Sequence, residues 1–328
     1  MQTITQQIEE NKRKSKLVIF GFVILIGLIA FLLLWVISRL TGKYNIKTII
    51  IWTGIILLIA GCYTFWVYFH VNNILLHNSS ALKLSKAKFP KLYDIVEELI
   101  MVADIPMPSL YMIKDPSINA FATGRDPKHA SIAVNSGTLS KLNREELQGV
   151  LGHELSHIKN YDTRTDSIAV ALTGFIAASG IGLCAVGFAM MRSNFWFSDG
   201  DHHDNNNWYS LIAILGFGIV LWIGGWLIRL FGVPLARIMQ YFLSRQRESL
   251  ADVSSVNLTK NPKGLIKAFR VMEKDSTAAT NDNAVASALF INTPTLKGKR
   301  EPLISRLFDT HPPLGERISR LKKLLNNN

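Results

Sequence analysis

The stretch LVIFGFVILIGLIAFLLLWVIS, residues 17–38, contains no Asp, Glu, Lys or Arg. Three further stretches share this property, and they cover residues 49–69, 168–191 and 209–228. A helix needs about 20 residues to cross the roughly 30 Å hydrocarbon layer of a bilayer, and each stretch reaches that length. Because lipid offers no hydrogen-bond partners to the backbone, such segments must be helical. The sequence therefore predicts four transmembrane helices.

The rest of the chain has the composition of a soluble protein, because all 36 Lys and Arg and all 24 Asp and Glu lie there. The whole chain is 48% hydrophobic and only 18% charged, which argues against a purely soluble enzyme and against a disordered chain. Both cysteines, Cys62 and Cys184, lie inside predicted spans. A disulfide-stapled secreted domain and a cysteine-based zinc site are therefore not expected.

Two large segments, 70–167 and 229–328, lie outside the predicted spans and are separated only by the third and fourth of them. The hairpin of these two spans would bring both segments to one membrane face, where we expect them to build a single domain. In the third span, Gly174, Ala178 and Gly182 fall four apart on one helix face, which predicts close helix packing at that face.

Lys and Arg predict the orientation, because loops on the cytoplasmic side are enriched in them. Residues 1–16 carry four Lys or Arg just before the first span, and segment 229–328 has 17 Lys and Arg against 8 Asp and Glu. Loop 192–208 has one Arg against three Asp, which is typical of the outside. Only loop 39–48, which is basic, disagrees. We therefore expect 70–167, 229–328 and both termini on the cytoplasmic side of a prokaryotic cell membrane.

The net charge of +12 has two possible causes, nucleic acid binding and contact with anionic lipid headgroups. No RNA- or DNA-binding motif accompanies the charge. We therefore expect the lipid bilayer, and no nucleic acid, as its partner.

A well-marked helix lies in the first large segment, after two short strands expected at 109–113 and 131–135. Asn143 is a good N-cap, and Glu146 three residues later completes a capping-box pattern. The helix that starts there runs directly into His153-Glu154-Leu155-Ser156-His157.

This pentad predicts a metal site, because residues four apart on a helix lie on one face, so that both imidazoles can reach one ion. Zinc suits two neutral imidazoles plus a carboxylate, with water at the open fourth position. Glu154 would then stand beside that water as a general base, while the ion lowers the pKa of the water toward about 7. The alternative is a surface helix that happens to carry two histidines.

A candidate third ligand lies after the fourth span, in Ser244-Arg245-Gln246-Arg247-Glu248-Ser249-Leu250-Ala251-Asp252. On a helix, Glu248 and Asp252 would share one face. Glu248 would bind the metal, and Asp252 would accept the outer ring N–H of a histidine ligand and orient the ring. Acidic residues four apart are common on solvated helices, so this pattern gains its meaning from the pentad.

With these motifs in place, the chain resembles the HtpX family of integral-membrane zinc endopeptidases, which is distantly similar to the CAAX prenyl proteases. The resemblance covers essentially the whole chain. It rests on the four predicted spans and on four motifs in order: Asn119-Ala120-Phe121-Ala122-Thr123-Gly124, His153–His157, Ser244–Glu248 with Ala251-Asp252, and Thr310-His311-Pro312-Pro313-Leu314 with Arg317. Ser249 departs from the family, in which an aromatic residue often follows the glutamate, but this position binds no metal.

The resemblance implies a mainly α membrane protein, with four transmembrane helices plus an α+β gluzincin-like zinc peptidase domain formed by the two cytoplasmic segments. It implies one Zn²⁺ per chain, held by His153, His157 and Glu248. The implied activity is cleavage of misfolded or damaged membrane proteins, or of other unfolded polypeptides, at the cytoplasmic face.

The resemblance also implies roles that spacing alone does not. Asn119, Ala120, Phe121, Ala122 and Thr123 would add the substrate as an extra strand beside the helix. His311 and Arg317 would stabilise the oxyanion of the tetrahedral intermediate. Without the family, the first stretch would be an ordinary turn, His311 a loop histidine and Arg317 a surface cation.

Two alternatives stay open. One is a specialised processing peptidase of the prenyl-protein or signal-peptide type. The presence of only four spans argues against the prenyl-protein type. The other is a membrane scaffold with a structural zinc site. A structural site usually has four protein ligands and no open position, whereas three ligands beside a glutamate favour catalysis.

Overall fold

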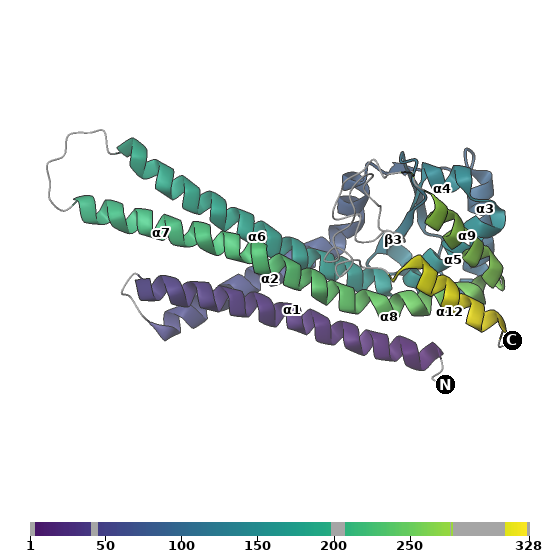
Figure 1. Ribbon diagram of the computed structural model, residues 1–328, viewed down its shortest axis with the longest axis horizontal. Coiled ribbons are helices and arrows are strands. Elements are labelled where there is room, and N and C mark those ends of the chain that lie inside the picture. Colours follow the sequence, from purple (N-terminus) through teal and green to yellow (C-terminus); the bar gives the residue numbers. More distant parts are fainter. Residues whose placement is uncertain (1–3, 41–44, 198–206, 276, 278–311, 327–328) are drawn as a thin grey trace. The chain divides into compact units, whose positions relative to one another are not determined.

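The computed structural model describes residues 4–40, 45–197, 207–275, 277 and 312–326, and these divide into two compact units (Figure 1). The membrane unit comprises Leu17–Phe65 and Val170–Met239. The sheet unit comprises Trp66–Ala169 and Gln240–Asn328, together with Met1–Lys16.

All four predicted spans are helices, and among the described residues four helices are long and apolar enough to cross a membrane, as predicted. The first three helices extend beyond both ends of the charge-free stretches from which they were predicted. Part of the predicted outer loop 192–208 is helical too, and residues 198–206 lie outside the described part of the chain. The four helices are α1 (Ile4–Leu40), α2 (Ile46–Asn78), α6 (Asp162–Phe197) and α7 (Asn207–Leu227).

The fourth span lies further along the chain than predicted. After α7 the backbone passes through one π-helical turn, η2 (Ile228–Gly232), and continues as α8 (Val233–Thr259). The apolar part covers Ile214–Ala236, whereas we predicted 209–228. A charge-based boundary stops the span at Arg229, but the apolar sequence resumes directly after this residue. One arginine thus lies inside an otherwise apolar span.

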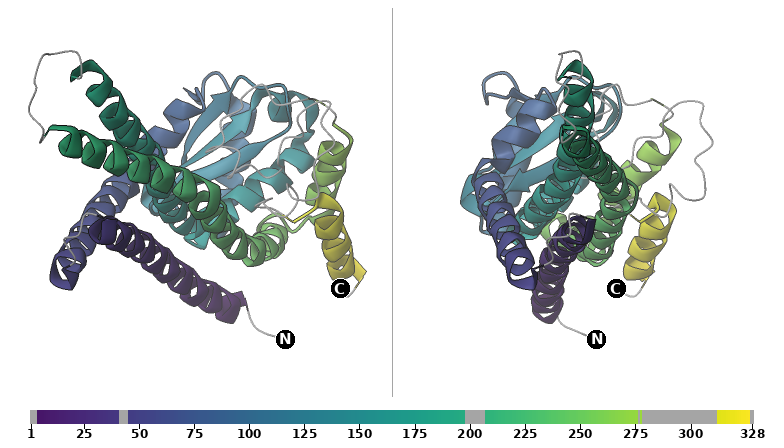
Figure 2. Two further views of the ribbon diagram at one scale, coloured as in Figure 1. Left: turned by 60° about the vertical axis from the view of Figure 1, so that its left-hand side comes forward. Right: turned by 90° about the vertical axis from the view of Figure 1, so that its left-hand side faces the viewer.

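Helices α6 and α7 run side by side in opposite directions (Figures 1 and 2). A Cβ atom on Gly187 would come within 2.5 Å of the Gly218 backbone oxygen, and one on Gly225 within 2.6 Å of the Gly180 oxygen. These four glycines let the two backbones approach. The predicted packing face was wrong at Gly182, where a Cβ atom would meet no described residue within 4 Å. Spacing identifies a face of small residues but not the neighbour that covers it.

The sheet unit contains a four-stranded mixed sheet in the order β1-β2-β4-β3. Strand β2 is parallel to β4, while β1 and β3 are antiparallel to their neighbours. Strand β3 is last in this order and is therefore an outer strand. The expected strands 109–113 and 131–135 are β2 and β4, and the stretch considered as a turn or a strand is β3. The strands are β1 (Leu82–Lys83), β2 (Ser109–Ile113), β3 (Ala120–Gly124) and β4 (Ala130–Asn135), with a 3-10 turn η1 (Pro127–His129) before β4.

Helix α5 (Arg144–Lys159) lies at the centre of this unit and packs against β3, α3 and α9 (Figure 1). The two flanking helices, α3 (Pro90–Ala103) and α9 (Pro262–Lys274), bury one apolar face each, at helical spacing. Because α5 is covered on several sides, most of its residues are buried, including polar ones. The remaining helices are α4 (Ser136–Lys141) and α12 (Leu314–Asn326).

Glycines bring α5 close to the elements that follow the fourth span. A Cβ atom on Gly149 would lie 2.7 Å from the backbone nitrogen of Leu265 in α9. On the same face of α5, Gly152 lies against Ser255 of α8, whose hydroxyl donates to the Gly149 carbonyl at 2.9 Å. This close contact between α5 and α8 fixes the distance between the pentad and Glu248.

Candidate metal centre

The helix that carries the pentad starts at the predicted N-cap. The Asn143 side chain accepts from the Glu146 backbone N–H at 3.0 Å, and the Glu146 carboxylate accepts from the Asn143 N–H at 3.0 Å. This capping box satisfies two of the backbone N–H groups that a helix leaves without partners at its start. The start of α5 is therefore fixed ten residues before His153, and His153 and His157 lie one turn apart on this helix.

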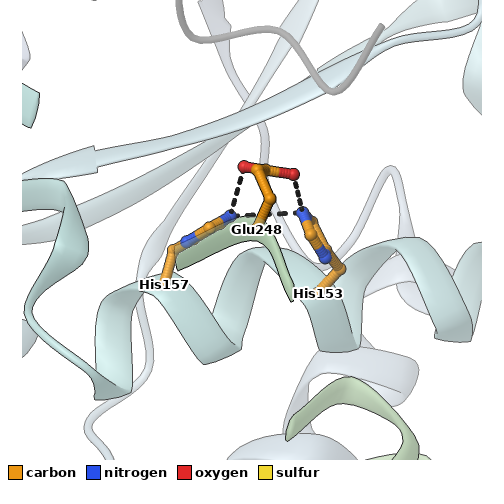
Figure 3. A group of neighbouring side chains, drawn as sticks. All are labelled: His153, His157 and Glu248. Atoms are coloured by element: carbon orange, nitrogen blue, oxygen red, sulfur yellow. Dashed lines mark hydrogen bonds and ion pairs between the residues drawn. The ribbon is translucent and has the colours of Figure 1, made fainter. Parts of the chain in front are cut away.

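Figure 3 shows both imidazoles rising from α5 toward the carboxylate of Glu248, which comes from α8. The two Nε2 atoms are 3.2 Å apart. The Nε2 atom of His153 lies 3.4 Å from Oε2 of Glu248, and that of His157 lies 3.3 Å from Oε1. His153 and Glu248 are buried and His157 is nearly so.

These separations fit a metal ion. Ligand atoms bound tetrahedrally at about 2.0–2.1 Å from an ion lie about 3.3–3.4 Å from one another. The two Nε2 atoms are 3.2 Å apart, and each lies 3.3–3.4 Å from one carboxylate oxygen of Glu248, Oε1 for His157 and Oε2 for His153. Imidazole nitrogen and carboxylate oxygen are also the donors that divalent metals accept in proteins. The residues present therefore fit a metal ligand set.

The other nitrogen of each ring faces a carboxylate. The Nδ1 atom of His153 lies 3.2 Å from Oδ1 of Asp252, and that of His157 lies 3.1 Å from Oδ2 of Asp162. A carboxylate at the outer nitrogen holds the proton there, so that the inner nitrogen keeps its lone pair for a metal. The sequence prediction for Asp252 corresponds to this geometry.

Sequence reasoning missed Asp162. It lies five residues after His157, beyond the end of α5, where helical spacing predicts no contact. The chain turns at Tyr161, whose φ of 60° is in the left-handed region, and α6 then begins at Asp162. This turn brings the Asp162 carboxylate back to His157. The only signal in the sequence is an acidic residue at the start of the next helix.

Arg317 of α12 is fully buried and joins two of these carboxylates. Its Nε and Nη2 atoms donate to Asp252 at 3.0 and 2.6 Å, and its Nη1 atom lies 3.2 Å from Oε2 of Glu248. The guanidinium carbon also lies 4.3 Å from the ring centroid of Phe269. The structure places the Arg317 guanidinium among the carboxylates around His153. The oxyanion role of Arg317 stays a prediction.

A second buried arginine plays a similar part near His157. Arg247, next to Glu248 in α8, forms an ion pair with Asp166 and donates to the backbone carbonyl of Asp162 at 3.1 Å. The start of α6 is thereby tied to the helix that carries the third candidate ligand. The sequence analysis did not single out Arg247 or Asp166 for this role.

The pKa values reflect this crowding. Burial, and for His153 also the charge of Arg317, lowers the pKa of the imidazoles, but the neighbouring carboxylates outweigh these effects and raise both values, for His157 well above the ordinary 6.5. Burial raises the pKa of Asp252, but Arg317 and His153 outweigh it and lower the value. The site thus concentrates negative charge around two ring nitrogens, which suits a cation.

The other predicted site residues lie as follows. Glu154 is buried on α5, one residue after His153. Asn119 is held by Thr138, whose hydroxyl contacts both its N–H and its carbonyl at 2.7 Å. Strand β3, which follows Asn119, packs against α5 and is an outer strand of the sheet. His311 lies outside the described residues.

Comparison with known proteins finds a matching peptidase family and several similar proteins. Residues 86–325 match the model of peptidase family M48. The chain is 40% identical over 319 residues to a protease HtpX homolog of Streptococcus uberis, covering 97% of this chain and 99% of that protein. It is also 40% identical over 323 residues to a protease HtpX homolog of Limosilactobacillus reuteri, with the same coverage. A crystal structure of S. mikatae Ste24p aligns with a TM-score of 0.44 and 15% identity, covering 88% of this chain and 61% of that chain.

Proposed function

Since this chain belongs to peptidase family M48 and is a membrane metalloprotease, we propose that it hydrolyses peptide bonds with one zinc ion held by His153, His157 and Glu248. The observation that carries this proposal is the convergence of three donor atoms, all within 4.8 Å of one another, from two helices. Zinc is favoured over other divalent ions because the donors are two imidazoles and one carboxylate, the set typical of catalytic zinc.

In this proposal the chemistry that the ion supplies when bound is Lewis-acid polarisation of the scissile carbonyl and activation of water. Asp252 and Asp162 hold the two rings with their inner nitrogens toward the ion. Glu154, whose pentad position places it beside the ligands, takes the proton of the attacking water and delivers it to the leaving amine.

The test is Glu154→Gln in the full-length protein. This change keeps the size of the side chain and removes its basic group, so metal content is expected to stay near one ion per chain while cleavage of an unfolded protein is lost. Metal is measured by elemental analysis and cleavage by gel. A Glu154→Gln protein that cleaves at the wild-type rate contradicts the mechanism.

A second experiment uses a chelator to test whether the reaction needs the metal. Removal of the metal should abolish cleavage by the wild-type protein, and added Zn²⁺ should restore it. A chelated protein that still cleaves would show that the metal is not needed for the reaction, whatever Glu154 does.

We further propose that β3 receives the substrate backbone as an added strand. Its place at the edge of the sheet, beside the helix that carries Glu154, supports this role for the stretch Asn119–Thr123. Main-chain pairing reads few side chains and therefore suits varied substrates. A peptide substrate with one backbone N-methyl group near the cleaved bond should show a raised KM, and an unchanged KM at every position would contradict the proposal.

The proposed substrates are misfolded or damaged membrane proteins and unfolded polypeptides, cut at the cytoplasmic face of a prokaryotic cell membrane. The charge pattern of the loops supports this orientation. Membranes from cells with the active protein and from cells with only the Glu154→Gln variant should differ in fragments of many unrelated proteins. One defined fragment would instead favour the specialised processing peptidase.

A further inference from the structure

One basic residue, Arg229, lies inside the fourth span. The apolar part of that span runs over Ile214–Ala236, and Arg229 is its only charged residue. Among the described residues, the Arg229 side chain has no ion-pair or hydrogen-bond partner. Charged side chains inside a bilayer are rare and usually mark a functional site, because moving them out of water is costly.

The register of α6 and α7 gives the depth of this residue. Gly187 faces Gly218 and Gly180 faces Gly225. Gly180 lies 12 residues after the start and 11 before the end of the charge-free stretch 168–191. At 1.5 Å per residue, both distances are about 17–18 Å, so Gly180 marks roughly the middle of the span.

The Arg229 side chain points toward this middle. Its Cγ atom lies 2.9 Å from the position that a Cβ atom on Gly180 would occupy, and its guanidinium lies 4.9 Å from the ring centroid of Trp226, one turn earlier. Helical side chains lean toward the N-terminal end of their helix, which here leads away from the nearer end of the span. The missing side chain at Gly180 provides the space for the arginine stem.

The surroundings of Arg229 are apolar and exposed. Leu230 and Phe231 are 63% and 64% exposed, and Trp226 and Leu227 are each 48% exposed. Arg229 itself is exposed and belongs to the π-helical turn η2. Single π-helical turns occur frequently at functional sites. A helix face that would otherwise suit lipid thus carries a cation at mid-depth.

We propose that Arg229 recognises an acidic side chain within a transmembrane segment of a substrate. This inference rests on the proposed function, in which the substrates are membrane proteins. A guanidinium binds a carboxylate through two parallel hydrogen bonds, and the pairing removes two buried charges from lipid at once. A membrane protein that has lost its partners exposes such intramembrane carboxylates, so Arg229 selects these proteins for cleavage.

Two other sources of negative charge fit less well. A second copy of this chain offers no Asp or Glu within residues 17–38, 49–69, 168–191 or 214–236. Lipid phosphates lie at the bilayer surface, about 15 Å from the middle of a hydrocarbon layer of about 30 Å. The Arg229 stem leads away from the nearer surface, whereas a transmembrane carboxylate can lie at the same depth.

The experiment measures capture of a test helix in phosphatidylcholine vesicles. The protein is the full-length Glu154→Gln variant, so that captured helices are not cut. The probes are single-span polyleucine helices with Asp, Asn or Leu at the centre, and capture is read by photocrosslinking. The Asp helix should be captured roughly 3- to 20-fold more than the Leu helix, the range of interhelical polar contacts in membranes. Adding Arg229→Leu should remove this preference.

The matched control is Arg39→Leu, because Arg39 also lies over a tryptophan one turn earlier, 5.6 Å from the Trp35 ring centroid, but at the end of its span. It should keep the preference for Asp. Equal capture of Asp and Leu helices, or a preference that survives Arg229→Leu, overturns the proposal. The proposal is also overturned if the Asp helix is not preferred and Arg229 instead binds phosphatidylglycerol that is added to the vesicles. That result would favour a lipid headgroup as the ligand.

Cleavage of a soluble unfolded protein separates this inference from the proposed function. Arg229→Leu with Glu154 intact should cleave that protein at the wild-type rate, because Arg229 belongs to the membrane unit. Loss of that cleavage would show a folding defect, and Arg229→Lys, which keeps the charge but not the paired hydrogen bonds, then replaces it. Arg229→Lys should lower the preference for Asp without abolishing it.

Discussion

The sheet unit and the membrane unit place their charged and apolar side chains in opposite ways. The sheet unit buries charges, among them Glu248, Asp252, Arg247 and Arg317, and each contacts an opposite charge. The membrane unit exposes large apolar side chains such as Leu58, which is 67% exposed. Buried charges need partners because burial removes them from water, whereas lipid suits exposed apolar side chains.

The comparison teaches where function is to be sought in each unit. In the sheet unit, charges that are costly to bury converge on two ring nitrogens, and the convergence marks the metal centre. In the described part of the membrane unit, the other charged residues lie at or near the ends of the apolar spans, and Arg229 inside Ile214–Ala236 is the exception.

Glu248→Ala tests the paired charges of the sheet unit most severely. It removes one proposed metal ligand and leaves Arg317 without one of its two carboxylates. We expect no bound metal and no cleavage, together with a loss of about 3–5 kcal/mol in unfolding free energy from the broken buried pair. Metal analysis and chemical denaturation measure the two effects. The control is Glu97→Ala, which breaks the exposed Lys86–Glu97 ion pair and should change stability by less than about 1 kcal/mol.

Asp162→Asn and Asp252→Asn compare the two carboxylates that orient the histidines. Each should lower metal affinity by roughly 10- to 100-fold, because the outer hydrogen bond of one ring is weakened. Asp252→Asn should cost more stability, since Asp252 also accepts two hydrogen bonds from Arg317. Competition with a chelating dye gives the affinities. An Asp162→Asn protein with unchanged affinity would show that the residue does not orient His157.

Gly187→Ala and Gly182→Ala test packing in the membrane unit. A methyl group at Gly187 would lie 2.5 Å from a backbone oxygen of α7, whereas one at Gly182 meets nothing within 4 Å. We expect Gly187→Ala to destabilise the protein by about 1–3 kcal/mol, as overpacking usually does. Gly182→Ala should be neutral or stabilising by up to about 1 kcal/mol. Thermal unfolding in detergent compares them, and equal effects would contradict the observed helix contact.

The smallest expected effect concerns the Asp275–Lys141 ion pair in the sheet unit. Burial raises the pKa of Asp275, but hydrogen bonds from Lys141 and Thr277 outweigh it and lower the value below the ordinary 3.8. The carboxylate therefore stabilises the folded state above about pH 4 and loses this contribution as the pH falls toward the lowered pKa. Asp275→Asn should cost about 0.5 kcal/mol at pH 7 and less near pH 2. Denaturation at both pH values measures the difference.

Much of the fold and site was predictable because it depends on local spacing. The charge-free stretches predicted four spanning helices, and the capping box at Asn143 predicted the start of α5. The pentad alone predicts that two imidazoles share a helix face. The packing face at Gly182 was predicted wrongly because it depends on which neighbour covers α6, and the fourth span differs because its apolar sequence continues past Arg229.

The set of spanning helices, the pentad and the residue types able to bind a metal could thus be read from the sequence, because they follow from composition and from a period of 3.6 residues. The fold was needed to show that Asp162 turns back to His157, that Arg317 joins Asp252 to Glu248, and that the Arg229 stem lies against Gly180. The physical reason is that these contacts join segments far apart in the chain or cross a break in a helix. Their distances depend on how backbones approach, and no local pattern encodes that approach.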